Sequence, residues 1–299
     1  MRGRTSTRTR WLAIAAALTL ALGCTPDGGD DDDDGAGGGS GDGGLADMAL
    51  PNVPYEGQID PLPAESTVDE QSYFPTPAGG VWRYRRQAPD PAMPPPVTEG
   101  GERRVEPGEG ENEWIMTTVV VLDVPVDGEV TKVRQVIRET LVVVPEVELV
   151  GPQVLFKRLD IEEREIGTER FVRTLTRTYN PPYQLVFDTW KTGLIGNRLQ
   201  PEGVQMVQTS QARGDEEPAE LMGIVTLSVE TTSTPLILVM EGAFREGVHR
   251  IDVVDDFSGM VSRTYWVQQG VGIVQWQYRD TNNIIYTLTE SNVEAASAE

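Results

Sequence analysis

The stretch VGIVQWQYRDTNNIIYTL, residues 271–288, carries the pattern that decides the fold. Large apolar side chains occupy alternate positions in both halves of it, at Val274, Trp276, Tyr278, Ile284, Tyr286 and Leu288. A period of two residues is typical of a β-strand with one buried face. The two apolar sets face each other only if the turn between them has an odd number of residues, and we predict a three-residue turn at Thr281-Asn282-Asn283.

The same alternation, rich in Val, Ile, Thr, Tyr and Trp, continues through the chain from residue 72. It predicts strands at 81–86, 114–122, 130–144, 153–164, 169–179, 183–190, 203–210 and 223–231, with four more toward the end. Turn residues such as Asp127-Gly128 and Asn180-Pro181-Pro182 separate these runs. Parallel pairing needs crossovers of about a dozen residues, for which the short connections leave no room. We therefore predict an all-β fold with a single antiparallel, strongly twisted meander sheet. An open half-barrel, as in carrier lipoproteins or lipocalins, is one form of such a sheet.

A second hairpin is predicted around Ser258-Gly259. If these two residues form the turn, Ile251 faces Trp266 on an apolar face. Arg263 then lies on the opposite face, diagonal to acidic residues of the preceding strand. Such a pairing predicts a sheet that is buried on one side and charged on the other.

Charge and residue types exclude several classes of function. The chain has 25 Lys and Arg residues against 47 Asp and Glu, a formal charge of −22, which repels nucleic acid. His249 is the only histidine and Cys24 the only cysteine, so zinc sites and His-based nucleophile systems lack their residues. No glycine-rich phosphate-binding motif occurs. We expect a protein that is not an enzyme, with no catalytic residue, cofactor or metal.

The amino terminus has the organisation of an export signal. A basic segment with Arg2 and Arg10 precedes the apolar run Trp11–Leu22, which is shorter than the roughly 20 residues of a membrane-spanning helix. The run ends in Ala21-Leu22-Gly23-Cys24, which resembles the lipobox of bacterial lipoproteins, with Ala21 and Leu22 departing from the usual Leu and small residue. The resemblance implies cleavage before Cys24 and acylation, for example with palmitate, which anchors the protein to a membrane.

This reading divides the chain into four parts: a signal peptide at 1–23, a lipid-anchored linker at 24–71, an antiparallel β domain at 72–291 and a disordered tail at 292–299. The linker is rich in Gly and Asp, with Asp30–Asp34 unbroken, and is predicted to be disordered because it cannot build a core. Within the domain, 88–113 and 214–220 are predicted to be exposed loops. We expect the domain to lie outside the cytoplasm in the cell envelope, with the outer membrane favoured over the inner.

Short motifs at both ends of the domain support an envelope location. Tyr73-Phe74-Pro75 followed by Trp82-Arg83-Tyr84 resembles the start of a loose group of uncharacterised bacterial lipoproteins. Tyr265-Trp266-Val267 and the glycines at 270 and 272 resemble the closing strands of that group. The resemblance implies a mostly β domain in the envelope, and it brings no activity with it.

Four aromatic residues are candidates for a ligand-lining surface, namely Trp82, Tyr84, Trp266 and Trp276. Packing in the core is the alternative role for all four. The first functional hypothesis is accordingly a non-enzymatic binding module, which takes an apolar small molecule against the concave side of the sheet or contacts another envelope protein.

The second hypothesis is a carboxylate-based envelope hydrolase acting on glycans, because acidic residues are abundant. The nominal pairs are Glu162-Glu163, Asp255-Asp256 and Glu216-Glu217. Adjacent residues of a strand point to opposite faces, which argues against such pairs. His249 is expected to be structural or to face solvent.

Overall fold

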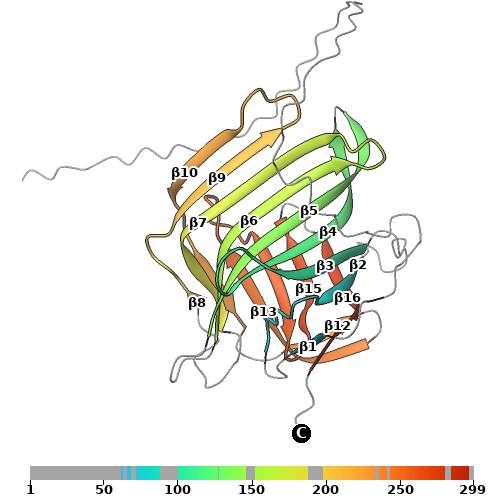
Figure 1. Cartoon of the computed structure of the whole chain (residues 1–299), viewed down its shortest axis with the longest axis vertical. Coiled ribbons are helices and arrows are strands. Elements are labelled where there is room, and N and C mark those ends of the chain that lie inside the picture. Colours follow the sequence, from blue (N-terminus) through green and yellow to red (C-terminus); the bar gives the residue numbers. More distant parts are fainter. Residues whose placement is uncertain are drawn as a thin grey trace, which may run out of the picture. The chain divides into compact units, whose positions relative to one another are not determined.

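The computed structural model describes residues 62, 66–68, 72–87, 100–126, 128–145, 152–187, 198–232, 236–240, 243–279 and 284–295 (Figure 1). Cys24, the predicted signal peptide and almost all of the predicted linker lie outside these residues. The regular elements in the described part are the strands β1 (Ser66–Val68), β2 (Val81–Arg86), β3 (Gly100–Pro107), β4 (Glu113–Val126), β5 (Glu129–Val144), β6 (Gln153–Glu165), β7 (Phe171–Phe187), β8 (Arg198–Leu199), β9 (Gln205–Ala212), β10 (Ala219–Ile224), β11 (Ser228–Thr231), β12 (Leu236–Met240), β13 (Ala243–Val254), β14 (Arg263–Gln268), β15 (Gly272–Tyr278), β16 (Ile285–Ser291) and β17 (Val293–Ala295). A search of these residues found no helix with the length and apolar character of a membrane span.

Fifteen of the strands form one sheet, in the order β10-β9-β7-β6-β5-β4-β3-β2-β16-β15-β14-β13-β11-β8, with β12 added beside β13. All of the pairs that make up this sheet are antiparallel. β10 and β8 end the order and do not pair with each other among the described strands, so the sheet is open rather than a barrel. The predicted all-β, single antiparallel sheet is confirmed.

Two meanders make up most of this sheet. Strands β2 to β7 follow the chain order along one part, and β13 to β16 follow it along the other. Pairing of β16 with β2 joins the two parts, with Leu288 opposite Tyr84. A separate parallel pair of β1 with β17 lies outside the expected limits of the β domain at 72 and 291.

Three details of the predicted strands are wrong. The predicted loop at 88–113 contains β3, which pairs with β2 over residues 100–104 and with β4 over residues 101–107. The predicted strands 169–179 and 183–190 are one strand, β7, because a register irregularity absorbs the residues around Asn180-Pro181-Pro182 without ending the strand. The predicted strand 223–231 is two strands, β10 and β11, which lie near opposite ends of the sheet. The predicted loop 214–220 is also too long, because its last two residues, Ala219 and Glu220, belong to β10.

One predicted hairpin has the right faces but a shifted register, and the other is off by one residue. In β15 and β16, Trp276 faces Tyr286, so the two apolar sets share one face as predicted. A three-residue turn at 281–283 would put Tyr278 opposite Tyr286, so the observed pairing is shifted by two residues, while residues 280–283 themselves lie outside the described part of the chain. In β13 and β14, Ile251 faces Tyr265 instead of Trp266, because Asp255–Ser262 form a longer connection than a two-residue turn. Asp256 holds this connection by accepting the backbone N–H groups of Ser258 and Gly259 at Oδ1. A shift of one residue moves every side chain of the strand to the other face.

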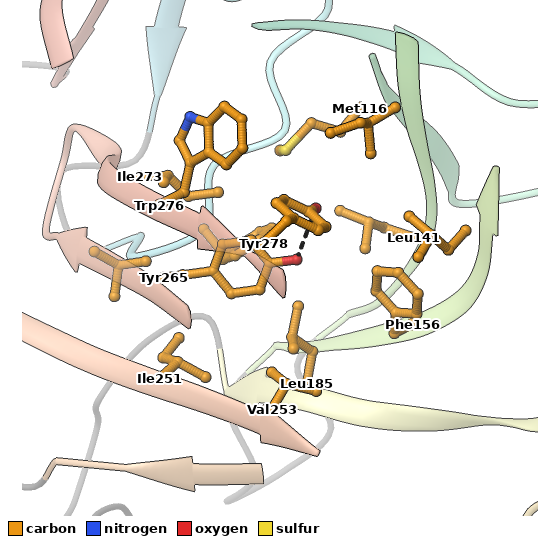
Figure 2. Close-up of a cluster of buried hydrophobic side chains, with 14 of the residues drawn as sticks. Met116, Leu141, Phe156, Leu185, Ile251, Val253, Tyr265, Ile273, Trp276 and Tyr278 are labelled. Carbon is orange, nitrogen blue, oxygen red and sulfur yellow. Dashed lines mark hydrogen bonds between the residues drawn. The ribbon is translucent and has the colours of Figure 1, made fainter. Parts of the chain in front are cut away.

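The core lies where the curved sheet faces itself. Figure 2 shows Met116, Leu141, Phe156 and Leu185 of β4 to β7 opposite side chains of β13 to β15. Side chains of both groups are fully or almost fully buried: Ile251, Val253, Tyr265, Ile273, Trp276 and Tyr278 on one side, and the four residues above on the other. In Figure 1 the green and yellow strands β5 to β7 accordingly lie in front of the orange and red strands β13 and β15. The curvature therefore buries apolar surface between two parts of the same sheet.

At Gly101 the backbone of β3 lies close to a side chain of the neighbouring strand β4. A Cβ atom added there would lie 2.7 Å from Cγ1 of Val120. We expect Gly101→Ala to lower the free energy of unfolding by about 1–3 kcal/mol, since the β-branched Val120 has little room to move. Urea unfolding measures this loss. If the clash is the cause, adding Val120→Ala costs less in the Gly101→Ala background than in the wild type.

Candidate functional site

Three of the four candidate aromatics lie on the concave side of the sheet. On β2, the indole Nε1 of Trp82 donates to the carbonyl of Val271, and the hydroxyl of Tyr84 donates to the carbonyl of Ile273, each at 2.8 Å. Trp276 of β15 stacks on Tyr286 with ring centroids 4.3 Å apart and an angle of 10° between the planes. These contacts hold β2 and β16 against β15, so the three aromatics pack within the core.

Trp266 lies on the other face. Its neighbour Tyr265 points into the core, and adjacent residues of a strand point to opposite sides. The ring is 9% exposed and is covered by Arg250, whose Cζ lies 5.6 Å from the ring centroid. The structure therefore separates Trp266 from the other three candidates.

Four buried charges form the centre of the concave side. Arg103 of β3 pairs with Glu139 of β5, with 3.4 Å between Nη2 and Oε2. Arg263 of β14 lies between Glu139, at 3.9 Å from Nη1 to Oε1, and Asp255, with which it forms an ion pair. The side chains of all four are at most 1% exposed. We call Arg103, Glu139, Arg263 and Asp255 the buried ion cluster. It links β3, β5, β14 and the β13–β14 connection, so it joins the two parts of the sheet across the core.

Tyrosine hydroxyls donate hydrogen bonds to the two carboxylates of the buried ion cluster. Tyr179 and Tyr183 of β7 donate to Oδ2 of Asp255 at 2.9 and 2.6 Å. Tyr265 donates to Glu139, and its oxygen lies 3.2 Å from the hydroxyl of Tyr278. Burial raises the pKa of the Tyr265 hydroxyl far above its usual range, so it stays protonated as a donor.

The pKa of Asp255 reflects its partners rather than its burial. Burial by itself raises the pKa of this carboxyl. The charge of Arg263 and the hydrogen bonds from Ser262 and Tyr183 outweigh burial and hold the pKa below its ordinary value. Asp255 is therefore ionised in the folded protein at neutral pH, and its charge is engaged in holding the fold.

A small cavity adjoins Arg103. It measures about 10 Å³ and is lined by Phe74, Pro75, Trp82, Tyr84, Arg103, Met116, Gly272 and Ile273. That volume suits about one water molecule, whereas pockets for small organic ligands measure roughly 300–1,000 Å³. The guanidinium Nε of Arg103 donates to Thr118 at 2.7 Å, and its Cζ lies 5.3 Å from the ring centroid of Trp276. This cavity is too small for an acyl chain.

The nominal acidic pairs do not converge. Glu163 points inward and binds Gln135 and Arg173, whereas Glu162 binds Arg164 on the other face. Asp255 belongs to the buried ion cluster, and its neighbour Asp256 holds the β13–β14 connection. Glu216-Glu217 are exposed in the turn before β10. In the described residues no three His, Cys, Asp or Glu side chains stand in an arrangement that could hold a metal ion.

His249 of β13 is nearly buried. Its Nδ1 lies 3.1 Å from the carbonyl oxygen of Thr232, and its ring meets that of Tyr73 edge to face. Burial lowers the pKa of the imidazole. These contacts fit the structural role expected from the sequence.

The most conspicuous surface feature is the sheet edge at β10. Three apolar side chains of this strand are largely exposed: Leu221 at 50%, Met222 at 56% and Ile224 at 74%. Phe257 of the β13–β14 connection is also exposed, and its ring lies over Gly223, where an added Cβ would come within 3.2 Å of Cε1. We call Leu221, Met222, Ile224 and Phe257 the β10 edge surface. Several exposed apolar side chains gathered on one strand are typical of interaction sites.

The sequence indicated neither the buried ion cluster nor the β10 edge surface. A signal for the cluster was present in β5, where Glu139 stands at the same alternation as the buried Ile137 and Leu141. For the edge surface, local sequence holds no signal, because apolar alternation looks the same in a central strand and in an edge strand.

Comparison with known proteins identifies no relative of this chain. No protein family, no curated protein and no solved structure matches the chain significantly.

Proposed function

We propose that the chain is a lipid-anchored protein of the bacterial cell envelope, and that its β domain is a non-enzymatic binding module for another envelope protein. The lipobox-like ending at Cys24 supports the anchor. The single observation that carries the binding role is the β10 edge surface, whose apolar side chains are exposed at the end of the sheet.

The described side chains on the concave side give no support to an apolar small molecule as the ligand. Trp82, Tyr84 and Trp276 pack against one another's strands, and the cavity beside Arg103 has room for about one water molecule. We expect delipidated protein to show no saturable uptake of a fluorescent fatty acid. Stoichiometric uptake that Trp276→Ala abolishes in a folded variant would instead favour the small-molecule role.

The anchor is tested by removing the only thiol. In bacteria grown with radioactive palmitate, the wild-type chain should be labelled and should sediment with membranes. Cys24→Ser should lose the label completely, because no other cysteine can take its place. Ser40→Ala in the linker is the matched control and should keep the label. Mass spectrometry that finds an unmodified thiol at the mature amino terminus of the wild type would contradict the anchor.

The binding role is tested by site-specific photo-crosslinking in the envelope. A photoreactive residue at Ile224 should give one discrete adduct with another protein, whereas the same residue at Val130, which is 77% exposed near the start of β5, should give none. Equal labelling at both positions, or no adduct at Ile224, would count against a binding module at this surface.

A further inference from the structure

We propose that β10 binds its partner by strand addition, and that the partner contributes an extended, basic segment with alternating apolar residues. This inference rests on the proposed binding role and specifies its mode and the chemistry of the partner. Main-chain hydrogen bonds to a sheet edge provide affinity in such complexes, and alternate side chains provide specificity.

Because β10 lies at the edge of the sheet, its outer main-chain N–H and C=O groups are available to a partner strand. Among the described strands, β10 pairs only with β9, from Ala219 opposite Ser210 to Ile224 opposite Gln205. An edge strand keeps one row of N–H and C=O groups unpaired by the sheet, and these groups form a template for another strand. The pairing of β10 with β9 also contains no β-bulge or register shift.

The apolar side chains of β10 lie on both faces of the sheet. Gly223 faces Met206, which in turn faces the buried Tyr179, so this set lies on the concave side. Leu221 shares that side, because side chains two residues apart point the same way. Met222 and Ile224 lie on the convex side. A partner resting on one face would leave the other apolar set in water, whereas an added strand extends the sheet and covers part of both.

Phe257 widens the concave part of this surface. Its ring rests on the backbone at Gly223 and remains 40% exposed. The β13–β14 connection that carries it is fixed by Asp255 and Asp256, so the ring has a set position beside β10. An apolar side chain of an added strand would pack beside this ring.

Charge around β10 specifies a basic partner. Acidic residues stand in and before the strand, at Asp215, Glu216, Glu217 and Glu220, and all four are exposed. The one basic residue of this hairpin, Arg213, already pairs with Glu165 at 2.6 Å. Complementary charge beside an apolar surface selects a basic partner and accelerates association.

The same charge argues against a second copy of this chain. Each copy has a formal charge of −22, and two copies would repel each other at contact. A partner with Lys and Arg beside its apolar residues gains attraction where a second copy meets repulsion.

Synthetic peptides test the proposal on the intact protein. The probe is a fluorescent peptide of alternating Val and Thr with two Lys residues at each end. Its binding to the wild type, followed by fluorescence anisotropy, should be saturable and should weaken with added salt. The same peptide with Glu in place of Lys should bind at least about tenfold more weakly. Methylation of alternate backbone nitrogens should abolish binding, because it removes the donors of one strand edge.

Variants of the protein test whether the peptide binds at the β10 edge surface. Met222→Gln/Ile224→Gln removes apolar surface without a change in charge and should weaken binding of the Lys-flanked peptide about tenfold. Glu216→Gln/Glu217→Gln/Glu220→Gln should remove most of the salt dependence. Ile237→Gln is the matched control, since Ile237 is 66% exposed on β12, another strand with a single partner, and should bind as the wild type does.

Several outcomes would overturn strand addition at β10. They are equal binding of the methylated peptide, no effect of Met222→Gln/Ile224→Gln, or no saturable binding at all. A dimer of the wild type in sedimentation velocity that Met222→Gln/Ile224→Gln dissolves would assign the edge to a second copy and would also overturn it. If Ile224 gives a discrete crosslink in the envelope while the peptides do not bind, the binding role holds and only the strand mode fails.

Discussion

Replacing Asp255 with Asn is expected to lower the free energy of unfolding by about 3–5 kcal/mol, because it leaves Arg263 buried beside a neutral side chain. Of the two carboxylates beside Arg263, the more distant Glu139 remains, and it also serves Arg103. Urea unfolding at neutral pH measures the loss. Asp252→Asn is the matched control: Asp252 pairs with Arg250 in a partly exposed position, and its loss should cost less than about 1 kcal/mol. Equal costs for the two variants would show that the buried ion cluster does not stabilise the fold.

The Asp255 contribution should also depend on pH. The pKa of this carboxyl is lower in the folded chain than its unfolded value of about 3.9. A lowered folded-state pKa stabilises the fold above the unfolded pKa, and the contribution disappears as pH falls through the folded-state pKa. The stability difference between wild type and Asp255→Asn should therefore be constant above about pH 5 and shrink below about pH 4. A difference that grows on acidification would contradict this assignment.

Arg263→Met should cost less in the Asp255→Asn background than in the wild type. In the double variant, the unpaired cation and its partner are both gone, and apolar replacement of a buried ion pair is often close to neutral. Additive losses would indicate that Asp255 and Arg263 act independently.

Trp276→Ala is expected to cost about 3–5 kcal/mol, since it removes a fully buried indole and leaves a cavity between β15, β16 and β2. Trp266→Ala on the convex face should cost less, because that residue is 9% exposed and its ring packs against the charged side chain of Arg250. Thermal or urea unfolding of both variants gives the comparison. Similar losses would mean that the convex face is packed as tightly as the core.

Alternation in the sequence predicted the strands where one face is uniformly apolar. The shared apolar face of β15 and β16 was predicted because Trp276 and Tyr286 belong to unbroken alternating sets, although the pairing itself is shifted by two residues from the predicted turn. It failed for β13 and β14, where the turn chemistry of Asp256 sets the register and no two-residue turn forms. β3 was missed because Gly100, Gly101 and the inward Arg103 interrupt its apolar pattern. Arg103 is tolerated in the core because it forms an ion pair with Glu139.

The candidate site depended on information that alternation does not contain. Which strands lie at an edge is set by pairing over long sequence distances, and β10 and β11 separate to opposite ends although only residues 225–227 connect them. Of the four aromatic candidates, Trp82, Tyr84 and Trp276 share the concave side. Their division from Trp266 required the register of β14.

The pairing of β2 with β16, which joins the two parts of the sheet, has a consequence for how the chain reaches its native state. Tyr84 pairs with Leu288, so nearly the whole domain separates these partners in sequence. Folds with such high contact order fold slowly, since loop closure precedes the contacts that compensate for it. Until the last strands emerge, β2 lacks one neighbour and the first meander cannot complete its core. A chain cut short before β16 should therefore be degraded or aggregate rather than persist as a stable half.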